Sequence, residues 1–113
     1  MPSFEAGDVV RVPFPYTNRE TTQRRPALVI SDGAVASGML LWVLMITSTA
    51  NRSWPGDVRI SSPDAATGLP APSMVRTLKM ATIEASAAER IGAISVSELA
   101  AVRAELRGVL GLG

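Results

Sequence analysis

The alternation of apolar and polar residues predicts several short strands in the first three quarters of the chain. Residues 7–14, GDVVRVPF, alternate in part and stop at a proline, as a half-buried strand does. Residues 27–31, ALVIS, predict a second short strand that ends at Asp32-Gly33. Residues 39–49, MLLWVLMITST, are apolar without alternation, so we expect a central strand that is covered on both faces.

The middle of the chain predicts a turn, two further strands and a connection. Trp54-Pro55-Gly56 is typical of a turn, and Asp57–Ile60 of a brief strand after it. Residues 61–73, SSPDAATGLPAPS, are rich in small residues and prolines, which favours a connection without a helix. Residues 73–83 alternate again, with Met74, Leu78 and Met80 on one parity. Arg76 shares that parity, so it is the exception on an apolar face.

One helix is predicted near the end of the chain. Ser95-Val-Ser-Glu98 matches a capping box, and Gly111 supplies a stop. Between them apolar residues recur at helical spacing, at Leu99, Val102, Leu106, Val109 and Leu110. Strands followed by one amphipathic helix indicate a mostly-β domain of the α+β class, and the length of 113 residues fits a single domain over residues 1–113.

Composition narrows the classes of function. Hydrophobic residues make up 47% and charged residues 19%, which favours a globular protein, and the net charge of +1 means that attraction to nucleic acid must come from a local basic patch. Cysteine and histidine are absent, which excludes disulfides, thiolate nucleophiles and the usual zinc sites. The start of the chain lacks a signal-peptide pattern, and the longest apolar run, residues 39–46, is too short to cross a bilayer. We therefore expect a cytoplasmic protein without a membrane partner.

The remaining chemistry rests on arginines, hydroxyls and carboxylates. An RNA-cleaving site needs no metal or cofactor if the 2′-hydroxyl of the substrate attacks, but it needs a proton acceptor and donors for the charge on the phosphorane. Arg24, Arg25 and Arg76 are the candidate donors, because a guanidinium can give two hydrogen bonds to a phosphate. An arginine beside a strand is usually just exposed to solvent. Arg76, in contrast, alternates with apolar residues on one face of its strand, so its side chain must reach the surface or meet an anion.

Two further residues complete the candidates from the residue types alone. Thr47 could orient a phosphate through its hydroxyl, although a threonine at the end of a strand is ordinary. Glu20, in the predicted loop of residues 15–24, is the carboxylate nearest in sequence to Arg25, although a loop glutamate is usually just solvated. The scattered aspartates do not suggest a two-metal nuclease.

The order of several short motifs resembles a known family. The motifs RPALVIS at 25–31, ITS at 46–48, Gly68-Leu69, SMVR at 73–76 and Ile91-Gly92 occur in the order and spacing seen in MazF/PemK (Kid) toxins of bacterial type II toxin–antitoxin modules. The resemblance covers nearly the whole chain. It implies a small SH3-like β-barrel, shared with CcdB toxins, with a C-terminal amphipathic helix. It also implies a homodimer that cleaves single-stranded RNA (mRNA) at short motifs without metal, leaving a 2′,3′-cyclic phosphate and a 5′-hydroxyl.

The resemblance also assigns residues and a partner. Arg25, Thr47 and Arg76 fall on catalytic positions of the family, and Glu20 on a loop glutamate implicated in the MazF branch. Arg24, Ser48 and Lys79 complete the expected RNA-binding residues, and the expected partner is a cognate antitoxin with a flexible, acidic C-terminal segment. Leu78 stands where Kid-like proteins have an aspartate, and the histidine of that branch has no counterpart.

Two other functions stay open at this stage. A CcdB-like protein would inhibit a topoisomerase without catalysis, but this chain ends LRGVLGLG and lacks a tryptophan there. The other alternative is an inactive barrel that only binds an antitoxin, which Leu78 and the missing histidine favour.

Overall fold

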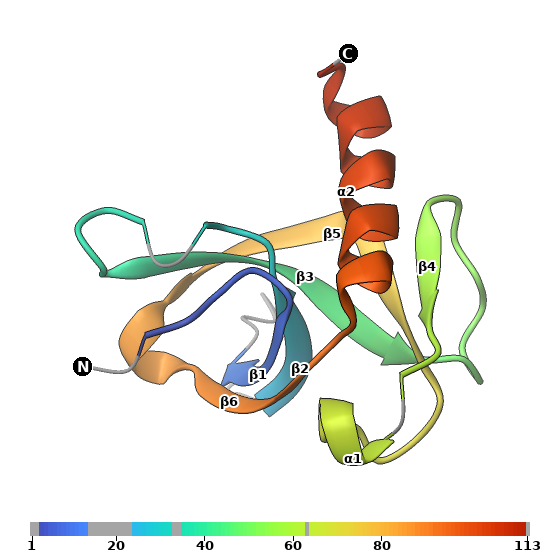
Figure 1. The fold of residues 1–113 in the computed structure, drawn as a ribbon, viewed down its shortest axis with the longest axis horizontal. Helices are drawn as coiled ribbons and strands as arrows, with labels where there is room; N and C mark the ends of the chain where they lie inside the picture. Colours follow the sequence, from blue (N-terminus) through green and yellow to red (C-terminus); the bar gives the residue numbers. More distant parts are fainter. Residues whose placement is uncertain (1–2, 14–23, 33–34, 63, 113) are drawn as a thin grey trace, which may run out of the picture.

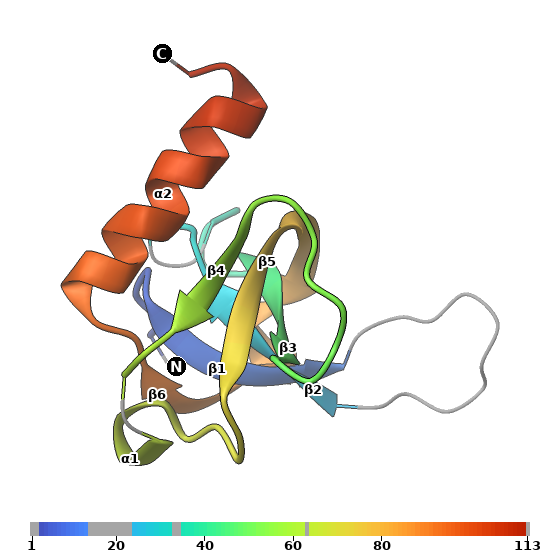
Figure 2. The same cartoon turned by 90° about the vertical axis from the view of Figure 1, so that its right-hand side faces the viewer.

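The fold is a curled antiparallel sheet with a helix at its C-terminal end (Figures 1 and 2). The computed structural model describes residues 3–13, 24–32, 35–62 and 64–112. Its six strands are arranged in the order β4-β5-β3-β2-β1-β6, and neighbouring strands are antiparallel. The predicted mostly-β α+β class with a C-terminal helix is confirmed. The elements are β1 (Asp8–Pro13), β2 (Arg24–Val29), β3 (Leu40–Ser48), β4 (Asp57–Ile60), α1 (Asp64–Thr67), β5 (Ser73–Glu84), the 3-10 helix η1 (Ala85–Ala87), β6 (Glu89–Ala93) and α2 (Val96–Leu110).

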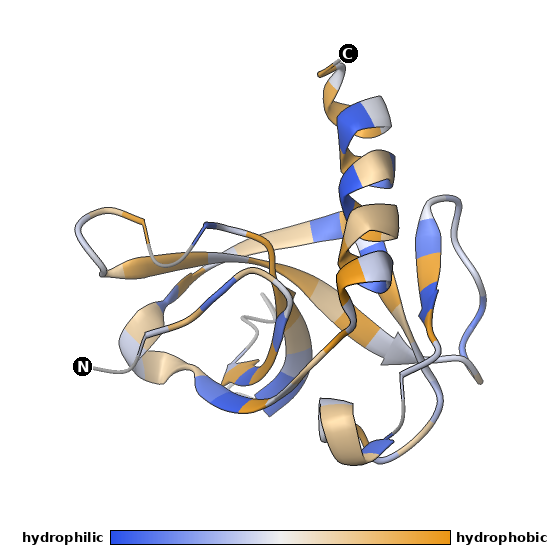
Figure 3. Cartoon of the chain, in the orientation of Figure 1, coloured by the Kyte–Doolittle hydropathy of each residue, from blue (hydrophilic) through white to orange (hydrophobic). Residues whose placement is uncertain are grey.

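Strand β3 divides the core into two layers, as its unbroken apolar sequence predicts (Figure 3). Val43 and Met45 belong to a cluster inside the curled sheet, which also contains residues of β1 and β2. Leu44 and Ile46, on the opposite face, pack in a second cluster beneath α2. Burial on both faces supplies most of the driving force for placing β3 in the middle of the sheet.

Helix α2 begins and ends where its capping residues predict. Ser95 and Glu98 form a complete capping box, and Gly111 ends the helix with a left-handed φ of 69°. The predicted apolar stripe is only half buried, however. Val102 and Leu106 lie in the core, whereas Val109 and Leu110 are exposed because the helix extends beyond the sheet (Figure 2). The last helical turns thus present apolar side chains on the surface.

Three parts of the chain differ from the expected pattern. Strand β2 begins at Arg24, so that residue belongs to the strand and not to the preceding loop; the rest of that predicted loop, residues 15–23, lies outside the described residues. One helical turn, α1, occupies the segment expected to lack a helix. Strand β6, which pairs with β1 at the edge of the sheet, was not predicted as a strand. These elements depend on contacts between distant segments more than on local pattern.

The alternation predicted along β5 is interrupted. Val75 pairs with Ile46 and Met80 pairs with Leu44. An advance of five residues along β5 therefore corresponds to an advance of only two residues along β3. The extra residues form an irregularity that shifts the parity. Val75 and Met80 therefore both lie on the side of α2, and Met80 is 46% exposed. The expected apolar face through Met74, Leu78 and Met80 is wrong beyond Arg76.

Glu98 joins the start of α2 to the segment after β4. Besides closing the capping box with Ser95, its carboxylate accepts hydrogen bonds from the backbone N–H groups and hydroxyls of Ser61 and Ser62. Burial would raise the pKa of Glu98, but the hydrogen bonds from Ser62, Ser95 and Ser61 outweigh it and lower the pKa from 4.5 to about 2. The charged form of Glu98 is therefore tied to the folded state.

Replacing Glu98 by glutamine is expected to lower the free energy of unfolding at pH 7 by about 1–3 kcal/mol. Because the folded pKa lies below the unfolded one, the contribution of Glu98 is fully present above pH 4.5 and is lost as the pH falls toward about 2. Urea unfolding at several pH values measures it, with Glu105→Gln, an exposed position on the same helix, as the control. Equal stability of Glu98→Gln and the control at pH 7 would contradict this role.

Candidate functional site

A buried arginine marks the candidate site. Arg76 lies on β5 directly opposite Asp57 of β4, and the side chains of Arg76 and Asp57 are only 7% and 5% exposed. A buried guanidinium is costly unless other groups compensate its charge. The sequence left open whether the Arg76 side chain reaches the surface or meets an anion. The structure shows that it meets an anion, which the protein itself supplies.

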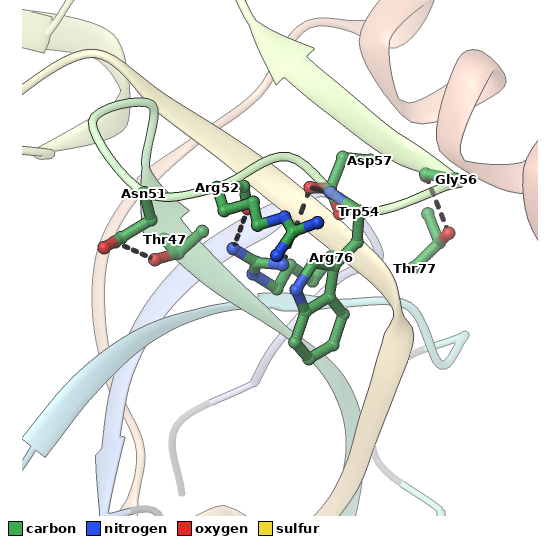
Figure 4. Close-up of polar contacts among 8 residues, drawn as sticks. All are labelled: Thr47, Asn51, Arg52, Trp54, Gly56, Asp57, Arg76 and Thr77. Atoms are coloured by element: carbon green, nitrogen blue, oxygen red, sulfur yellow. Dashed lines mark hydrogen bonds and ion pairs between the residues drawn. The ribbon is translucent and has the colours of Figure 1, made fainter.

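Three groups surround the Arg76 guanidinium (Figure 4). Its Nη1 lies 3.7 Å from Oδ2 of Asp57, and its Nη2 donates a hydrogen bond of 2.7 Å to the carbonyl oxygen of Arg52. Its Cζ lies 4.0 Å from the ring centroid of Trp54, which is cation–π geometry. Because Arg52 and Trp54 belong to the connection between β3 and β4, residues 49–56 hold the guanidinium in place; we call this connection the cover segment.

Two buried polar atoms of this cluster are left without a hydrogen bond. Arg76 Nη1 and Asp57 Oδ1 have no hydrogen-bond partner among the described residues, and the 3.7 Å between Nη1 and Oδ2 is an ion-pair distance and not a hydrogen bond. Asp57 Oδ2 is occupied, because it accepts a hydrogen bond of 2.8 Å from the backbone N–H of Trp54. Buried polar atoms are nearly always paired, so a donor and an acceptor left open in one cluster need an explanation.

Thr47 lies on the same face of the sheet as Arg76. Thr47 pairs with Met74, and Arg76 follows Met74 by two residues, which returns its side chain to that face. The Thr47 hydroxyl accepts a hydrogen bond of 2.7 Å from Nδ2 of Asn51 and is mostly buried. The same hydroxyl keeps its own proton to donate.

Arg25 shares this face as well. Ala27 pairs with Met45 in the ladder of β2 and β3. Arg25 precedes Ala27 by two residues and Thr47 follows Met45 by two, so both point to the side of Ala27 and Met45, the interior of the curled sheet. Among the described hydrogen bonds and ion pairs, none joins Arg25 to Arg76. The structure therefore brings the predicted trio to one face, with no described hydrogen bond or ion pair among its members.

The other predicted residues occupy more exposed places. Arg24 donates hydrogen bonds to the carbonyl oxygens of Arg11 and Ala87 and lies 3.9 Å from the carboxylate of Glu89. The hydroxyl of Ser48, the last residue of β3, accepts a hydrogen bond from the N–H of Ala50 in the cover segment. Lys79 is exposed on the irregular part of β5. Glu20 lies outside the described residues.

Sequence reasoning did not identify Asp57, Trp54 or Asn51 as partners of the predicted residues. Asp57 was recognised only as the first residue of a short strand, because nothing local reveals that it faces Arg76 across the ladder of β4 and β5. The one available signal was a charged residue directly after a Trp-Pro-Gly turn. Leu78, at the position where the resemblance led us to expect an aspartate, is 48% exposed.

Nothing in the cluster resembles a metal centre. The described residues contain no group of three or more acidic, histidine or cysteine side chains that could hold an ion. Among the same residues, no helix is long and apolar enough to span a membrane. The donors present, two arginines and a threonine hydroxyl on one face, suit an anion of the size of a phosphate.

Comparison with known proteins places the chain among characterised folds. Residues 5–110 match a family profile described as PemK-like, MazF-like toxin of type II toxin-antitoxin system. The crystal structure of MazF from Deinococcus radiodurans superposes with a TM-score of 0.75 at 26% identity, covering 98% of this chain and 99% of that one. A MazE–MazF structure from the same organism gives a TM-score of 0.72 at 27% identity, covering 95% of each chain.

More distant structures share the fold. A mycobacterial endoribonuclease solved in complex with its cognate antitoxin gives a TM-score of 0.73 at 19% identity and covers 96% of each chain. A search of curated protein sequences gives no match.

Proposed function

The chain belongs to the PemK-like, MazF-like toxins of type II toxin–antitoxin systems, and from this premise we propose that it is a metal-independent endoribonuclease that cleaves single-stranded RNA. The resemblance expected from the motifs is confirmed by the match over residues 5–110. In the proposed reaction the 2′-hydroxyl of the RNA attacks the neighbouring phosphorus, which yields a 2′,3′-cyclic phosphate and a 5′-hydroxyl. We expect this activity in the cytoplasm.

The observation that supports the proposal most is the buried Arg76 guanidinium with its open Nη1 donor. In a site of low dielectric a fixed guanidinium stabilises the charge that develops on a phosphorane far better than it would in water. Arg25 adds a second cation on the same face, and the Thr47 hydroxyl adds a neutral donor that positions the phosphate. Arg24, Ser48 and Lys79 would contact the RNA beyond the scissile bond.

End-group analysis tests the proposed function. The purified protein is incubated in EDTA with long single-stranded RNA of varied sequence, and the new ends are identified. We expect cuts at a short recurring motif, each with a 2′,3′-cyclic phosphate and a 5′-hydroxyl. Absence of cleavage, while a known toxin of the family cuts the same RNA, would exclude the proposal.

The proposed partners are a cognate antitoxin and a second copy of the chain. Solved structures similar to this chain include MazE–MazF complexes and an endoribonuclease bound to its cognate antitoxin. A flexible, acidic segment of such an antitoxin would suit the cationic face of Arg25 and Arg76. The homodimer is supported by an exposed apolar face, defined as the side chains around a cavity of about 380 Å³ between the sheet and the end of α2. Its apolar members are Ile30, Trp42, Met80, Leu106, Leu110 and Leu112.

Leu112→Glu is expected to shift the protein from dimer to monomer. Leu112 is 62% exposed on the apolar face, so the charge costs little in the monomer but must be desolvated in a dimer that buries this face. Sedimentation velocity measures the change. Val96→Glu serves as the control, because Val96 is exposed at the opposite end of α2. A dimer as stable in Leu112→Glu as in Val96→Glu would place the interface elsewhere.

An inactive, antitoxin-binding barrel is the second candidate function. The observation in its favour is that the groups around Arg76 are the protein's own, from Asp57, Arg52 and Trp54. The candidates separate on expression in bacteria: a ribonuclease arrests growth in a manner that Arg76→Gln abolishes, and an inactive barrel does not arrest growth. A CcdB-like inhibitor would arrest growth without cleaving RNA, but among the described residues the apolar side chains at the exposed end of α2, Val109, Leu110 and Leu112, are aliphatic and not aromatic.

A further inference from the structure

We propose that Asp57 is the catalytic carboxylate of this protein and accepts the proton of the RNA 2′-hydroxyl. This inference rests on the proposed ribonuclease function and names a residue that neither the sequence motifs nor the family match assigns. It also explains how the site can work although Leu78 replaces the aspartate that Kid-like relatives have on the strand of the catalytic arginine.

The position of Asp57 restores a carboxylate beside the arginine from a neighbouring strand. Asp57 on β4 is the direct cross-strand partner of Arg76 on β5, and its Oδ2 lies 3.7 Å from Nη1. Leu78, by contrast, is 48% exposed on the irregular part of β5. A carboxylate next to Arg76 is therefore present in the fold although the sequence of β5 lacks one.

The two open atoms match the reacting part of a ribonucleotide. Arg76 Nη1 is an unsatisfied donor and Asp57 Oδ1 an unsatisfied acceptor, and both atoms are buried. The scissile unit of RNA carries the complementary groups side by side: a phosphate oxygen that accepts a hydrogen bond, and a 2′-hydroxyl that donates one. DNA has the phosphate but lacks the hydroxyl, so it would leave Oδ1 unpaired. The pair of open atoms thus fits RNA as a substrate.

The rest of the cluster fixes Asp57 for this role. The N–H of Trp54 donates to Oδ2 at 2.8 Å, which orients the carboxylate and leaves Oδ1 for the substrate. Trp54 is 42% exposed where it covers Arg76, so its side chain can turn away to admit a nucleotide without opening the core. The other charged residues of the adjoining segments are Arg59, two positions along β4, and Arg52 in the cover segment; from α2, the carboxylate of Glu105 lies close to Gly56.

Bonds and protons balance in the proposed step. The O–H bond of the 2′-hydroxyl breaks and its proton moves to Asp57 Oδ1, while the 2′-oxygen forms a bond to phosphorus. The bond from phosphorus to the 5′-oxygen breaks, and the 5′-oxygen takes a proton from water. The hydroxide left by that water removes the proton from Asp57. The net reaction is a transesterification that returns the enzyme to its starting state.

The test is the pH dependence of kcat for wild type, Asp57→Asn and the control Asp64→Asn on an RNA oligonucleotide that contains the mapped cut site. Asparagine keeps the size of the side chain but cannot accept the proton, so Asp57→Asn is expected to lower kcat by roughly 100-fold or more and to remove the fall of kcat at acid pH. KM is expected to change less than about threefold, because Arg76 and Arg25 still bind the phosphate. Asp64→Asn, at an exposed position in α1, is expected to match the wild type.

Each result decides between the two claims. If the wild type cleaves RNA and the kcat of Asp57→Asn is within about threefold of the wild-type kcat, the inference is overturned and the ribonuclease function stands. An acid fall that survives in Asp57→Asn and disappears in Glu20→Gln would assign the proton acceptor to Glu20 and also overturn it. No cleavage by the wild type would overturn both. If Asp57→Asn does not fold, Asp57→Glu retains a carboxylate, and a folded Asp57→Glu without an acid fall in its kcat would contradict the proposal.

Discussion

Replacing Arg76 by glutamine is expected to lower kcat for RNA cleavage by at least about 100-fold, the usual cost of removing one fixed donor from a charge-stabilising site. Arg76 is the buried cation of the candidate site, and its Nη1 has no hydrogen-bond partner among the described residues. Glutamine keeps a polar end but supplies no charge for a phosphorane. The rate is measured at saturating RNA, so that weaker binding does not enter.

The buried environment of Arg76 calls for two companion variants. Removing the guanidinium leaves Asp57 without its ion-pair partner, which can destabilise a fold by several kcal/mol. Arg76→Lys keeps the positive charge for Asp57 but loses the planar fork, and we expect it to fold and to lose about tenfold or more in kcat. Arg11→Gln is the matched control. Arg11 is exposed, and it points to the opposite face of the sheet from its neighbour Val12, which pairs with Arg25.

Cleavage by folded Arg76→Gln within about threefold of the wild type would show that Arg76 is a structural residue of the sheet. Its ion pair, its hydrogen bond to the Arg52 carbonyl and its contact with Trp54 would then be sufficient reasons for its burial.

Replacing Gly92 by alanine is expected to destabilise the fold by about 3 kcal/mol or more, as overpacking against backbone does when nothing can move aside. Gly92 is buried in β6, and a Cβ there would overlap the carbonyl carbon and oxygen of Thr67 and the carbonyl oxygen of Ala66. These are backbone atoms of α1, so relief requires α1 to leave β6.

Gly108 provides the matched control for Gly92. It lies inside α2, and a Cβ added there would meet nothing within 4 Å beyond its chain neighbours and the helix's own backbone, so Gly108→Ala is expected to stabilise the protein by about 0.5–1 kcal/mol through helix propensity. Urea unfolding measures both effects: the unfolding midpoint is expected to fall in Gly92→Ala and to rise in Gly108→Ala. A midpoint of Gly92→Ala equal to that of the wild type would mean that the contact between α1 and β6 is not tight.

The glycine contacts also explain two of the sequence motifs in physical terms. Gly68, with a left-handed φ of 71°, faces Ile91, and a Cβ there would overlap the carbonyl oxygen of Ile91. Gly68-Leu69 and Ile91-Gly92 are therefore the two sides of one close approach between the end of α1 and β6. The sequence displayed both motifs, but it could not show that they touch.

The features that could be predicted from the sequence are those that a local pattern of residues specifies. The capping box of Ser95 and Glu98 and the stop at Gly111 depend on neighbours in sequence, and they are confirmed. The two-sided burial of β3 depends on distant segments, but the unbroken apolar run of the strand predicts it, and it is confirmed as well. The irregularity of β5, the strand β6 and the turn α1 depend on tertiary pairing, and they were missed or misassigned.

The candidate site divides in the same way. The place of Arg76 in an apolar alternation showed that its side chain must either reach the surface or meet an anion, and it left these two outcomes open. That the anion is Asp57 was not visible, because Asp57 meets Arg76 only through the pairing of β4 with β5, and no local signature of Asp57 reveals that pairing. The common face of Arg25, Thr47 and Arg76 likewise appears only when β2, β3 and β5 are aligned.

The most direct test of the central claim changes the substrate and leaves the protein intact. An RNA oligonucleotide with one mapped cut site is compared with the same oligonucleotide carrying a single 2′-deoxynucleotide on the 5′ side of the cut, in EDTA and with wild-type protein. If the 2′-hydroxyl is the attacking group, this one substitution abolishes cleavage at that bond, and the unsubstituted RNA ends in a 2′,3′-cyclic phosphate. Cleavage of the substituted bond at an undiminished rate would contradict the account.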